Sequence, residues 1–383
     1  MQCRAFSIAL AGICFLLGMQ YALAAEPIRV GVTASLTGDY AKLGRDQLSG
    51  IQMWADDVNA RGALLGRKVE IVHYDDASDP EKSAALYERL ISQDKVDLLL
   101  GPYSSDITLA ASRVVERHNF PMVATGAASA TIWEQGFSNI FQIDAPAGEY
   151  MELPLNLANG KGLKRVALLY ADTDFPREVA DGARSMAAGH VMQIVLDEAY
   201  PQDSQEFDDV ARRLMAADPD VVIGGTYFND SVALVRAIRQ AGLKPKIMVM
   251  TVGPAQEEFG RQLGEDANGV MGAIAWMRSG KMPLAYDFSF RYKQKYGHNA
   301  AVHAAYGYGG GQVLEAAVRL AGALDLDAVR EQLQNMKFRS LLGHYRVDNT
   351  GRQTAKNTFV MQWQNGYRLL VMPEDIADSA VKY

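Results

Sequence analysis

Two serines at the end of a short apolar run are the first residues whose type and spacing suggest chemistry. Ser104 and Ser105 follow Asp97-Leu98-Leu99-Leu100-Gly101-Pro102-Tyr103, and a run of leucines bounded in this way is typical of a strand buried on both faces. Either serine can cap the helix predicted to begin there. A hydroxyl beside the free N–H groups of a helix amino terminus is a suitable seat for a carboxylate or another small anion.

The second half of the chain repeats this strand–turn–helix pattern. Residues 220–225 form an apolar run, and Thr226-Tyr227-Phe228-Asn229-Asp230 forms a turn before the next helical pattern. Two similar units, each ending in polar and aromatic side chains, predict two lobes whose turns face one ligand.

These turns belong to a regular alternation of strands and helices. Strand patterns occupy residues 28–34, 68–74, 97–100, 121–124, 165–170, 191–198, 220–225 and 247–251, with helical patterns between most of them. Helices are then predicted at 284–296, 303–321 and 325–335, and late strands at 343–347, 358–363 and 367–372. The alternation predicts an α/β protein with two doubly wound, Rossmann-like lobes. In such sheets ligands bind at the carboxyl ends of the strands, where the polar loops fall.

The amino terminus predicts the compartment. Arg4 is the one charged residue before Glu26, the run 5–24 is apolar, and Ala22-Leu23-Ala24 supplies small residues at the cleavage positions. This pattern is typical of a secretory signal peptide over residues 1–25, although the run is also just long enough to serve as a membrane anchor. We expect a periplasmic location.

Composition narrows the class of protein further. Both cysteines, Cys3 and Cys14, lie in the predicted signal peptide, so the mature chain is expected to lack disulfides, thiolate metal sites and a cysteine nucleophile. A length of 383 residues suits about two domains. The formal net charge of −7, without a basic tract, disfavours nucleic acid as a partner.

Other motifs have two interpretations each. The small residues of Thr125-Gly126-Ala127-Ala128-Ser129 allow a ligand to approach backbone N–H groups closely, or form a plain tight connection. Asp75-Asp76 could hold a cation, or be a solvated or capping pair. Gly307-Tyr308-Gly309-Gly310-Gly311 lacks the Lys-Ser/Thr of a phosphate loop and predicts close helix packing instead. The six histidines are scattered without metal-ligand spacing.

Many short motifs in order identify a family. They are Ile28-Arg29-Val30-Gly31-Val32, Leu36-Thr37-Gly38-Asp39-Tyr40, Gly62-Ala63-Leu64-Leu65-Gly66-Arg67, Tyr74-Asp75-Asp76, Asp79-Pro80, Gly101-Pro102-Tyr103-Ser104-Ser105, Thr125 to Ser129, Gly224 to Asp230 and Gln362-Trp363-Gln364-Asn365-Gly366. With these motifs, essentially the whole mature chain resembles the periplasmic solute-binding proteins of the branched-chain amino acid (leucine/isoleucine/valine) ABC transporters, which have the type I periplasmic-binding fold.

The resemblance implies an architecture and a role. Two lobes would be joined by a three-strand hinge, with an N-terminal lobe of residues 26–144 plus 276–355 and a C-terminal lobe of residues 145–275 plus 356–383. The protein would close on a small carboxylate-bearing solute, such as a branched-chain or related amino acid, and deliver it to a membrane ABC permease. No cofactor, metal or catalytic residue is implied.

The resemblance also assigns a ligand site. The ligand carboxylate would contact hydroxyls and backbone amides of first-lobe turns, and aromatic side chains would flank the ligand. The positions that correspond to these roles are Ser104, Ser105, Gly126, Ala127, Ala128 and Ser129 for the carboxylate, and Tyr40, Phe175 and Tyr227 for the flanking rings.

One position departs from the family pattern. Amino acid binders of this family present a second-lobe acidic residue to the ligand ammonium, and the corresponding position here is Thr251. Asp230, Asp174 or Asp172 could supply the charge from a neighbouring loop. Alternatively the ligand has no ammonium, since an unpaired buried carboxylate is costly. In that case Tyr40, Tyr103, Phe175, Tyr227 and Trp276 would suit an aromatic carboxylate.

Two other function classes stay open at this stage. A ligand sensor could use the same fold and report to a separate partner. An enzyme such as an amide hydrolase is a third possibility, although neither Ser104 nor Ser129 lies in a Gly-x-Ser-x-Gly elbow and no nucleophile–base pair is visible.

Overall fold

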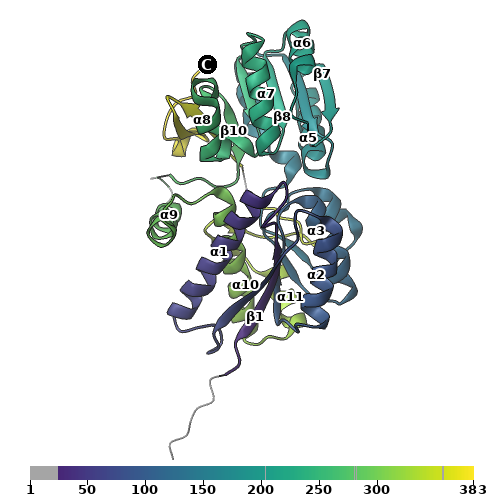
Figure 1. Cartoon of the computed structure of the whole chain (residues 1–383), viewed down its shortest axis with the longest axis vertical. Coiled ribbons are helices and arrows are strands. Elements are labelled where there is room, and N and C mark those ends of the chain that lie inside the picture. The colour runs from purple at the N-terminus through teal and green to yellow at the C-terminus, as the bar shows by residue number, and fades with distance from the viewer. Residues whose placement is uncertain (1–24, 203, 280, 282, 356–357) are drawn as a thin grey trace, which may run out of the picture.

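The computed structural model describes residues 25–202, 204–279, 281, 283–355 and 358–383. Almost all of the predicted signal peptide therefore lies outside the described residues. Figure 1 shows two lobes stacked along the long axis of the molecule, each with helices around a central sheet. This arrangement confirms the predicted α/β class with two lobes.

The first lobe contains a five-stranded parallel sheet in the order β2-β1-β3-β4-β5. Its strands are β1 (Ile28–Ala34), β2 (Val69–Asp75), β3 (Leu98–Leu100), β4 (Met122–Ala124) and β5 (Ile140–Gln142). Helices α1 (Ala41–Ala60) and α10 (Val302–Ala321) pack on each other beside one face, and α2 (Pro80–Ser92) and α3 (Ser105–Arg117) pack on each other beside the opposite face. Strand β5 was not predicted from the sequence.

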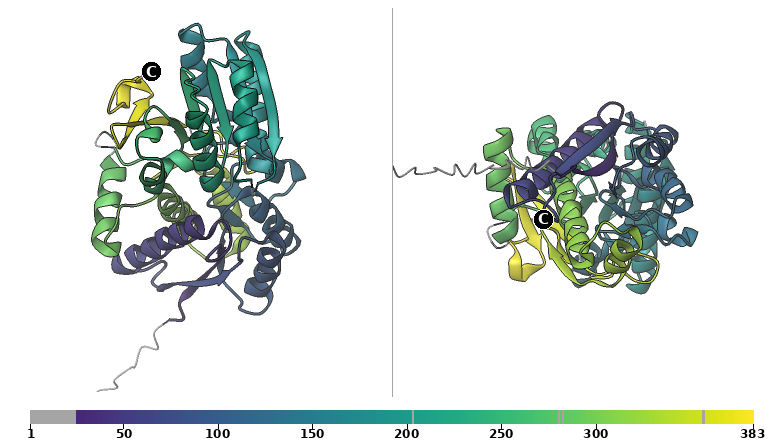
Figure 2. Two further views of the ribbon diagram at one scale, coloured as in Figure 1. Left: turned by 45° about the horizontal axis from the view of Figure 1, so that its top comes forward. Right: turned by 90° about the horizontal axis from the view of Figure 1, so that it is seen from below.

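The second lobe contains a seven-stranded sheet in the order β14-β13-β10-β9-β8-β6-β7. Its parallel part is β6 (Arg165–Ala171), β7 (Gln193–Tyr200), β8 (Val221–Gly225), β9 (Ile247–Met250) and β10 (Met271–Ile274), and β13 (Phe359–Gln364) and β14 (Tyr367–Met372) add an antiparallel edge. The associated helices are α4 (Glu152–Gly160), α5 (Asp174–Gly189), α6 (Asp208–Ala217), α7 (Phe228–Gln240) and α8 (Glu257–Leu263). Figure 2 shows the carboxyl-terminal hairpin, in yellow, at the edge of this lobe.

The chain passes between the two sheets three times. It leaves the first lobe after β5 and again after β12, which belongs to a separate two-stranded sheet, and it leaves the second lobe after β10. Between the last two crossings lie α9 (Pro283–Tyr296), α10, α11 (Leu326–Asn335) and a small hairpin of β11 (Phe338–Ser340) and β12 (Gly343–Tyr345). Short 3₁₀ segments complete the chain: η1 (Ala130–Gln135), η2 (Ala147–Glu149), η3 (Gly253–Ala255), η4 (Gly264–Ala267) and η5 (Glu374–Ile376).

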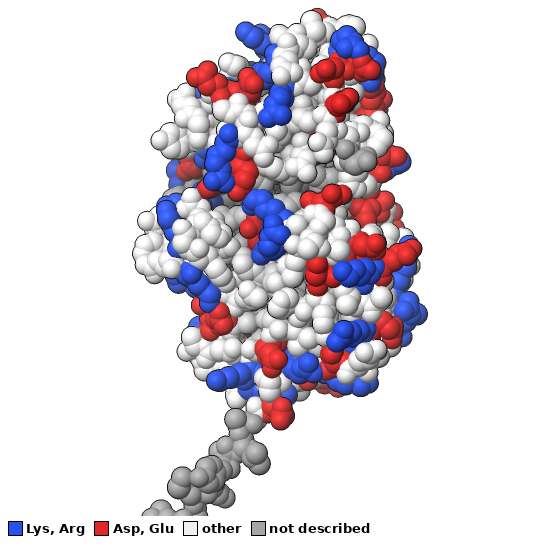
Figure 3. Space-filling model, viewed as in Figure 1, with Lys and Arg blue, Asp and Glu red and all other residues white. Residues whose placement is uncertain are grey.

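Surface charge and hydropathy are ordinary for a globular protein. Figure 3 shows acidic and basic side chains interspersed over the face in view. Within the described part of the chain, no helix combines the length and apolar character that a bilayer crossing requires.

The paired aspartates at the end of β2 hold a loop in place. Asp76 is fully buried, and its carboxylate accepts hydrogen bonds from the hydroxyls of Thr33 and Ser35. Asp75 accepts from the backbone N–H and the hydroxyl of Thr37, and these bonds help to hold the pKa of Asp75 at about 2 although burial opposes them. Both carboxylates are thus engaged in fixing the loop that leads to Tyr40.

Glycines allow α10 to approach α1 and the first sheet unusually closely. A Cβ added at Gly307 would lie 2.1 Å from the carbonyl oxygen of Gln47, and one added at Gly310 would lie 2.2 Å from Thr125. On the facing helix, a Cβ at Gly50 would lie 1.9 Å from the carbonyl oxygen of Ala304. The run 307–311 is therefore a helix-packing surface, as the sequence predicts.

Substitution of Gly50 by Ala is expected to destabilise the protein. Ala has the higher helix propensity, by about 1 kcal/mol, but the added methyl group would overlap backbone that cannot move without separating α1 from α10. Such overpacking costs about 1–3 kcal/mol, so after the gain in propensity we expect a net loss of about 1–2 kcal/mol in the free energy of unfolding, measured by urea denaturation.

A second glycine provides the matched control. Gly160 lies in α4, and nothing is within 4 Å of a Cβ added there. The Gly160→Ala variant should therefore be as stable as the wild type or slightly more stable. Equal effects at the two positions would show that the close contact between α1 and α10 does not limit the residue at position 50.

Candidate ligand-binding site

A small cavity lies between the two lobes and is lined by both. Its volume is about 50 Å³, which by the usual measure accommodates only a few water-sized groups. Of the residues predicted for the site, those that line it are Tyr103, Ser104, Ser105, Gly126, Ala128, Phe175, Tyr227 and Thr251. The remaining lining residues are Asp144, Tyr150, Val252, Ala255, Ala273, Ile274, Val302, His303 and Tyr306. The lobes are thus in a closed arrangement.

The hydroxyl of Ser105 connects two strand-end loops of the first lobe. Its Oγ accepts hydrogen bonds from the backbone N–H groups of Ala128, at 3.2 Å, and Ser129, at 3.1 Å. A serine hydroxyl can accept two hydrogen bonds and donate one, so the hydroxyl hydrogen of Ser105 is left for a ligand. The amides of Ala128 and Ser129 are thus already engaged, so among these three groups the Ser105 hydroxyl is the donor available to a carboxylate.

Ser104 has the role of helix cap and an unusual backbone conformation. Its Oγ accepts from the N–H of Ile107 at 3.3 Å, and its own N–H donates to the carbonyl oxygen of Gly126. The backbone angles are φ 75° and ψ 152°, a region that is populated almost entirely by glycine and costs about 1–3 kcal/mol for other residues. Strain of this size is commonly found at binding sites, where it fixes the position of a loop.

Four predicted residues lie just outside the cavity. Ala127 and Ser129 are buried in the loop behind Ser105. Tyr40 packs on the outer side of two lining rings, with its ring centroid 5.3 Å from that of Tyr103 and 5.2 Å from that of Tyr227. Asp230 lies in the wall of a separate recess of about 270 Å³ that also includes Tyr40 and Tyr227.

Aromatic rings from both lobes form a continuous wall. Phe175 lies with its centroid 5.5 Å from that of Tyr150 and 6.3 Å from that of Tyr227. On the other side Tyr103 packs edge-on against His303 at 4.8 Å. The pair of Tyr40 and Tyr227 joins the two lobes, and since such pairs contribute beyond their buried area, it favours the closed arrangement even without a solute.

The acidic residue of the cavity is Asp144 rather than any of the three suggested by the sequence. Its carboxylate accepts hydrogen bonds from the N–H of Ala145 at 2.7 Å and the hydroxyl of Tyr150 at 3.3 Å. Burial first, and the negative charge of Asp144 second, raise the pKa of Tyr306 well above its ordinary value. Asp144 therefore brings negative charge into a wall otherwise made of tyrosines, apolar groups and small residues.

The three acids proposed from the sequence are engaged elsewhere. Asp230 accepts from the hydroxyl of Tyr200 at 2.9 Å, and burial raises its pKa to about 6. Asp172 forms an exposed ion pair with Arg177. Asp174 accepts from the hydroxyl of Thr131 at 3.1 Å. None of these aspartates lines the cavity.

Thr251 and His303 contribute uncharged surface to the cavity. The Thr251 hydroxyl donates to the carbonyl oxygen of Thr226 at 2.5 Å and accepts from its N–H at 2.8 Å, so it binds the ends of β8 and β9 together. Burial, and then the charge of Lys42, lowers the pKa of His303 to about 3, so its imidazole is neutral at pH 7.

Polar contacts between the lobes hold the closed arrangement together. Lys42 of α1 lies 3.6 Å from the carboxylate of Glu258 in α8. Glu178 of α5 accepts from the N–H of Ala130 in η1. The Thr131–Asp174 hydrogen bond described above also joins η1 to α5.

One pair of charges opposes closure. Asp106, in the first turn of α3, faces Asp174, in the first turn of α5, whose N–H donates to Asp106 Oδ1 at 3.5 Å. The other oxygen of Asp106, Oδ2, is buried and has no hydrogen-bond partner. Burial, and then the negative charge of Asp174, raises the pKa of Asp106. Closing the lobes therefore brings two carboxylates together.

Three polar cavity residues that the sequence did not reveal come from two places. Asp144 follows β5, a three-residue strand whose apolar signal is short. Had β5 been recognised, an aspartate at the carboxyl end of a parallel strand would have been a candidate. His303 and Tyr306 lie on α10, where the apolar and glycine-rich pattern gives no indication of which face meets the second lobe. No group of three or more metal-ligating side chains occurs among the described residues.

Known proteins share this architecture. A family model described as a periplasmic binding protein matches residues 27–368. A relative from Brucella suis, "Leu/Ile/Val-binding protein homolog 7", is 26% identical over 378 residues, covering 94% of each chain.

Two solved structures show the fold. One is the branched-chain amino acid transporter substrate-binding protein LivJ from Streptococcus pneumoniae in complex with isoleucine, with 22% identity, a TM-score of 0.81, and coverage of 90% of this chain and 98% of that one. The other is an ABC transporter solute-binding protein from R. palustris in complex with benzoate, with 19% identity, a TM-score of 0.79, and coverage of 90% and 95%. Because the family model spans most of the sequence, the chain belongs to the periplasmic binding protein family.

Proposed function

We propose that this protein is the extracytoplasmic solute-binding component of an ABC importer, which captures one small carboxylate-bearing solute between its lobes and delivers it to a membrane permease. The observation that carries the proposal is the interlobe cavity, whose walls come from the strand-end turns of both sheets and include the Ser105 hydroxyl. Membership of a family of binding proteins supports it.

The proposal includes the compartment and the hinge. Removal of residues 1–25 would release the chain into the periplasm. The lobes would divide into residues 26–144 plus 276–355 and residues 145–275 plus 356–383, with the three crossings as the hinge. A solute that contacts both lobes favours the closed state by its higher affinity for that state.

The small cavity restricts the solute. Its volume is well below the 300–1,000 Å³ typical of sites for drug-sized ligands, so a solute with few heavy atoms fits best. Asp144 favours a solute that carries a cationic group besides its carboxylate, as an amino acid does. The relative from Brucella suis, named as a Leu/Ile/Val-binding homologue, supports this interpretation.

A second candidate is an aromatic carboxylate without an ammonium group. The uncharged Thr251 and the rings of Tyr103, Phe175 and Tyr227 favour it. The neighbour bound to benzoate supports it. A sensing role on the same fold would use the same cavity and differ only in the protein that reads the closed state.

A thermal-shift screen with an Asp144→Asn variant separates the two ligand classes. A solute at a hundred times its dissociation constant should add about 2.7 kcal/mol of stability. If isoleucine, leucine or valine stabilises the wild type, Asp144→Asn should weaken that binding at least tenfold, because it removes the charge facing the ammonium. If benzoate stabilises the wild type instead, Asp144→Asn should bind benzoate as tightly as the wild type does, or more tightly.

The screen also tests the role itself. The bound solute should be recovered chemically unchanged after incubation with the purified protein. Failure of every amino acid and small carboxylate to shift the unfolding temperature, or catalytic release of a product from simple amides, would contradict the proposal.

Replacement of Ser105 by Ala should weaken binding of the solute carboxylate by roughly 1–3 kcal/mol, because a buried hydrogen-bond donor to a charged group is lost. Ser112→Ala is the matched control, since its Oγ donates to the carbonyl oxygen of Thr108 within α3 at 2.7 Å, and the residue does not line the cavity. Isothermal titration should show a loss for Ser105→Ala alone. Equal losses would place the carboxylate elsewhere.

Replacement of Asp106 by Asn should favour closure. Because closure raises the pKa of Asp106, protonation stabilises the closed state, and affinity should rise as the pH falls from neutral toward that raised pKa. Asn keeps the acceptor for the N–H of Asp174 and removes the repulsion, so we expect affinity at pH 7 to rise about fivefold, or about 1 kcal/mol, with a flatter pH dependence.

Scattering and a control variant test this effect. Small-angle scattering should show a more compact ligand-free Asp106→Asn protein. Asp172→Asn changes the charge of an exposed residue nearby, whose ion pair with Arg177 contributes little, and should leave both affinity and dimensions unchanged. An unaltered pH dependence in Asp106→Asn would show that the Asp106–Asp174 pair does not oppose closure.

A further inference from the structure

A second and larger cavity lies at the hinge. Its volume is about 460 Å³, within the range typical of small-molecule sites. It shares no lining residue with the interlobe cavity. All three crossings contribute to its wall: Leu153 follows the first, Trp276 belongs to the second and Phe359 ends the third. The β11–β12 hairpin closes one side.

The second crossing separates the two cavities. Ala273 and Ile274 line the interlobe cavity, whereas the next two residues, Ala275 and Trp276, line the hinge cavity. A solute bound between the lobes therefore does not occupy the hinge cavity, and each cavity can be altered by substitutions that leave the other intact.

The wall of the hinge cavity contains an unpaired buried donor. Trp276 is 3% exposed, and its indole Nε1 is buried without a hydrogen-bond partner. An indole N–H can only donate, and a buried donor left unpaired is costly. The indoles of Trp133 and Trp363, by contrast, each donate to a backbone carbonyl oxygen at 3.0 Å. Trp276 thus lacks an acceptor that other buried tryptophans of this chain have.

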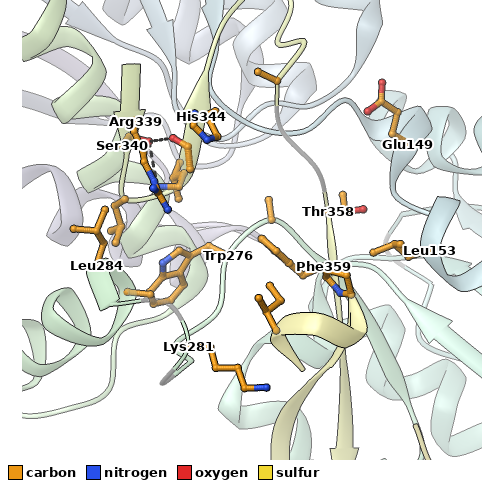
Figure 4. A pocket seen from close by; sticks show the side chains of 18 of the residues that line it. Glu149, Leu153, Trp276, Lys281, Leu284, Arg339, Ser340, His344, Thr358 and Phe359 are labelled. Carbon is orange, nitrogen blue, oxygen red and sulfur yellow. Dashed lines mark hydrogen bonds between the residues drawn. The ribbon is translucent and has the colours of Figure 1, made fainter. Parts of the chain in front are cut away.

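A cationic side chain lies beside this donor. Figure 4 shows the nitrogen-bearing edge of Trp276 on the side of the ring that faces Arg339 and Ser340. Within the described part of the chain, the Arg339 guanidinium forms neither an ion pair nor a hydrogen bond. The Ser340 hydroxyl already accepts from the N–H of Leu342 at 3.1 Å. The buried indole N–H of Trp276 and the exposed guanidinium of Arg339 thus both lack an acceptor among the described residues.

The rest of the wall indicates the shape of an occupant. Apolar groups come from Leu153, Leu284 and Phe359, and Figure 4 places Glu149 away from Trp276, on the far side of the cavity. A carboxylate near Trp276 and Arg339 would thus be separated from the nearest acidic side chains, and an apolar body would cover the middle of the cavity.

We propose that the hinge cavity is a second ligand site, which binds a small organic carboxylate with an apolar body through the indole N–H of Trp276 and the guanidinium of Arg339. Charge-assisted hydrogen bonds of an arginine to a carboxylate are roughly twice as strong as neutral ones. The carboxylate supplies the acceptor that the buried indole lacks.

The test uses the mature full-length chain, labelled with ¹⁵N, and phenylacetate as the probe. The Trp276 indole N–H resonance, assigned by its loss in Trp276→Phe, should shift on titration with phenylacetate. Phenylacetamide, which has the same shape without the charge, should bind at least tenfold more weakly. Arg339→Gln should weaken the phenylacetate titration by about tenfold or more. Arg113→Gln, which removes an exposed charge from α3, should leave the titration unchanged.

Binding in the interlobe cavity is distinguished by a further variant. Ser105→Ala should leave the titration of the Trp276 resonance unchanged, whatever it does to a solute between the lobes. In the absence of any probe, Trp276→Phe should destabilise the protein less than Trp133→Phe, because only the latter breaks a hydrogen bond. A Trp276 resonance that does not respond to phenylacetate, or a titration that responds equally to phenylacetamide or to Ser105→Ala, would overturn the proposal.

Discussion

The close packing of α10 on α1 and on the first sheet is the constraint on which the rest of the structure depends. The second crossing leaves the second lobe after β10, and the chain must return to the first lobe and cover its sheet. Glycines at 307 and 310 bring the backbone of α10 against Gln47 and Thr125. This contact fixes the height of the helix over the strand ends, and with it the positions of His303 and Tyr306 in the interlobe cavity.

Closure of the lobes results from a balance of opposing contacts. Aromatic packing around Tyr227 and the contacts of Lys42 and Glu178 favour the closed arrangement. The carboxylates of Asp106 and Asp174 oppose it, and the unpartnered Oδ2 of Asp106 is part of the cost. A ligand can shift such an equilibrium only by its differential affinity for the two states. A protein that has to release its solute again benefits from an empty closed state that is only weakly favoured, because a strongly favoured one would not respond to the ligand.

The sequence was most informative where a signal is local. Asp79 before Pro80 predicts the start of α2, and its side chain does accept from the N–H of Lys82. The Leu98–Leu100 strand followed by two serines predicts the position of Ser105, and the glycine run predicts helix packing. Hydrogen bonds within a turn and steric limits on a helix face depend on neighbouring residues, so they are readable from a single chain.

Details that depend on distant segments were not readable. The sequence shows that Ser104 and Ser105 end a strand, but not that Ser105 uses its acceptor capacity on Ala128 and Ser129, or that Ser104 has a positive φ. Asp230 looked like a ligand group because it lies beside Tyr227 in the chain. Its carboxylate instead meets Tyr200, which is 30 residues away. Asp144 was overlooked because β5 is only three residues long and is defined by pairing with β4.

The relation between the two cavities follows from the geometry of a hinge. The second crossing forms a layer between the interlobe cavity of about 50 Å³ and the hinge cavity of about 460 Å³. When two bodies rotate about such a layer, a gap that narrows on one side widens on the other. On our proposal, an organic carboxylate that fills the widened hinge cavity would bind the closed arrangement more tightly than the open one. By linkage, the carboxylate would then raise the protein's affinity for the solute between the lobes. The solute would raise the affinity for the carboxylate by the same factor. Both ligands would act on one equilibrium, the opening and closing of the two lobes about the hinge.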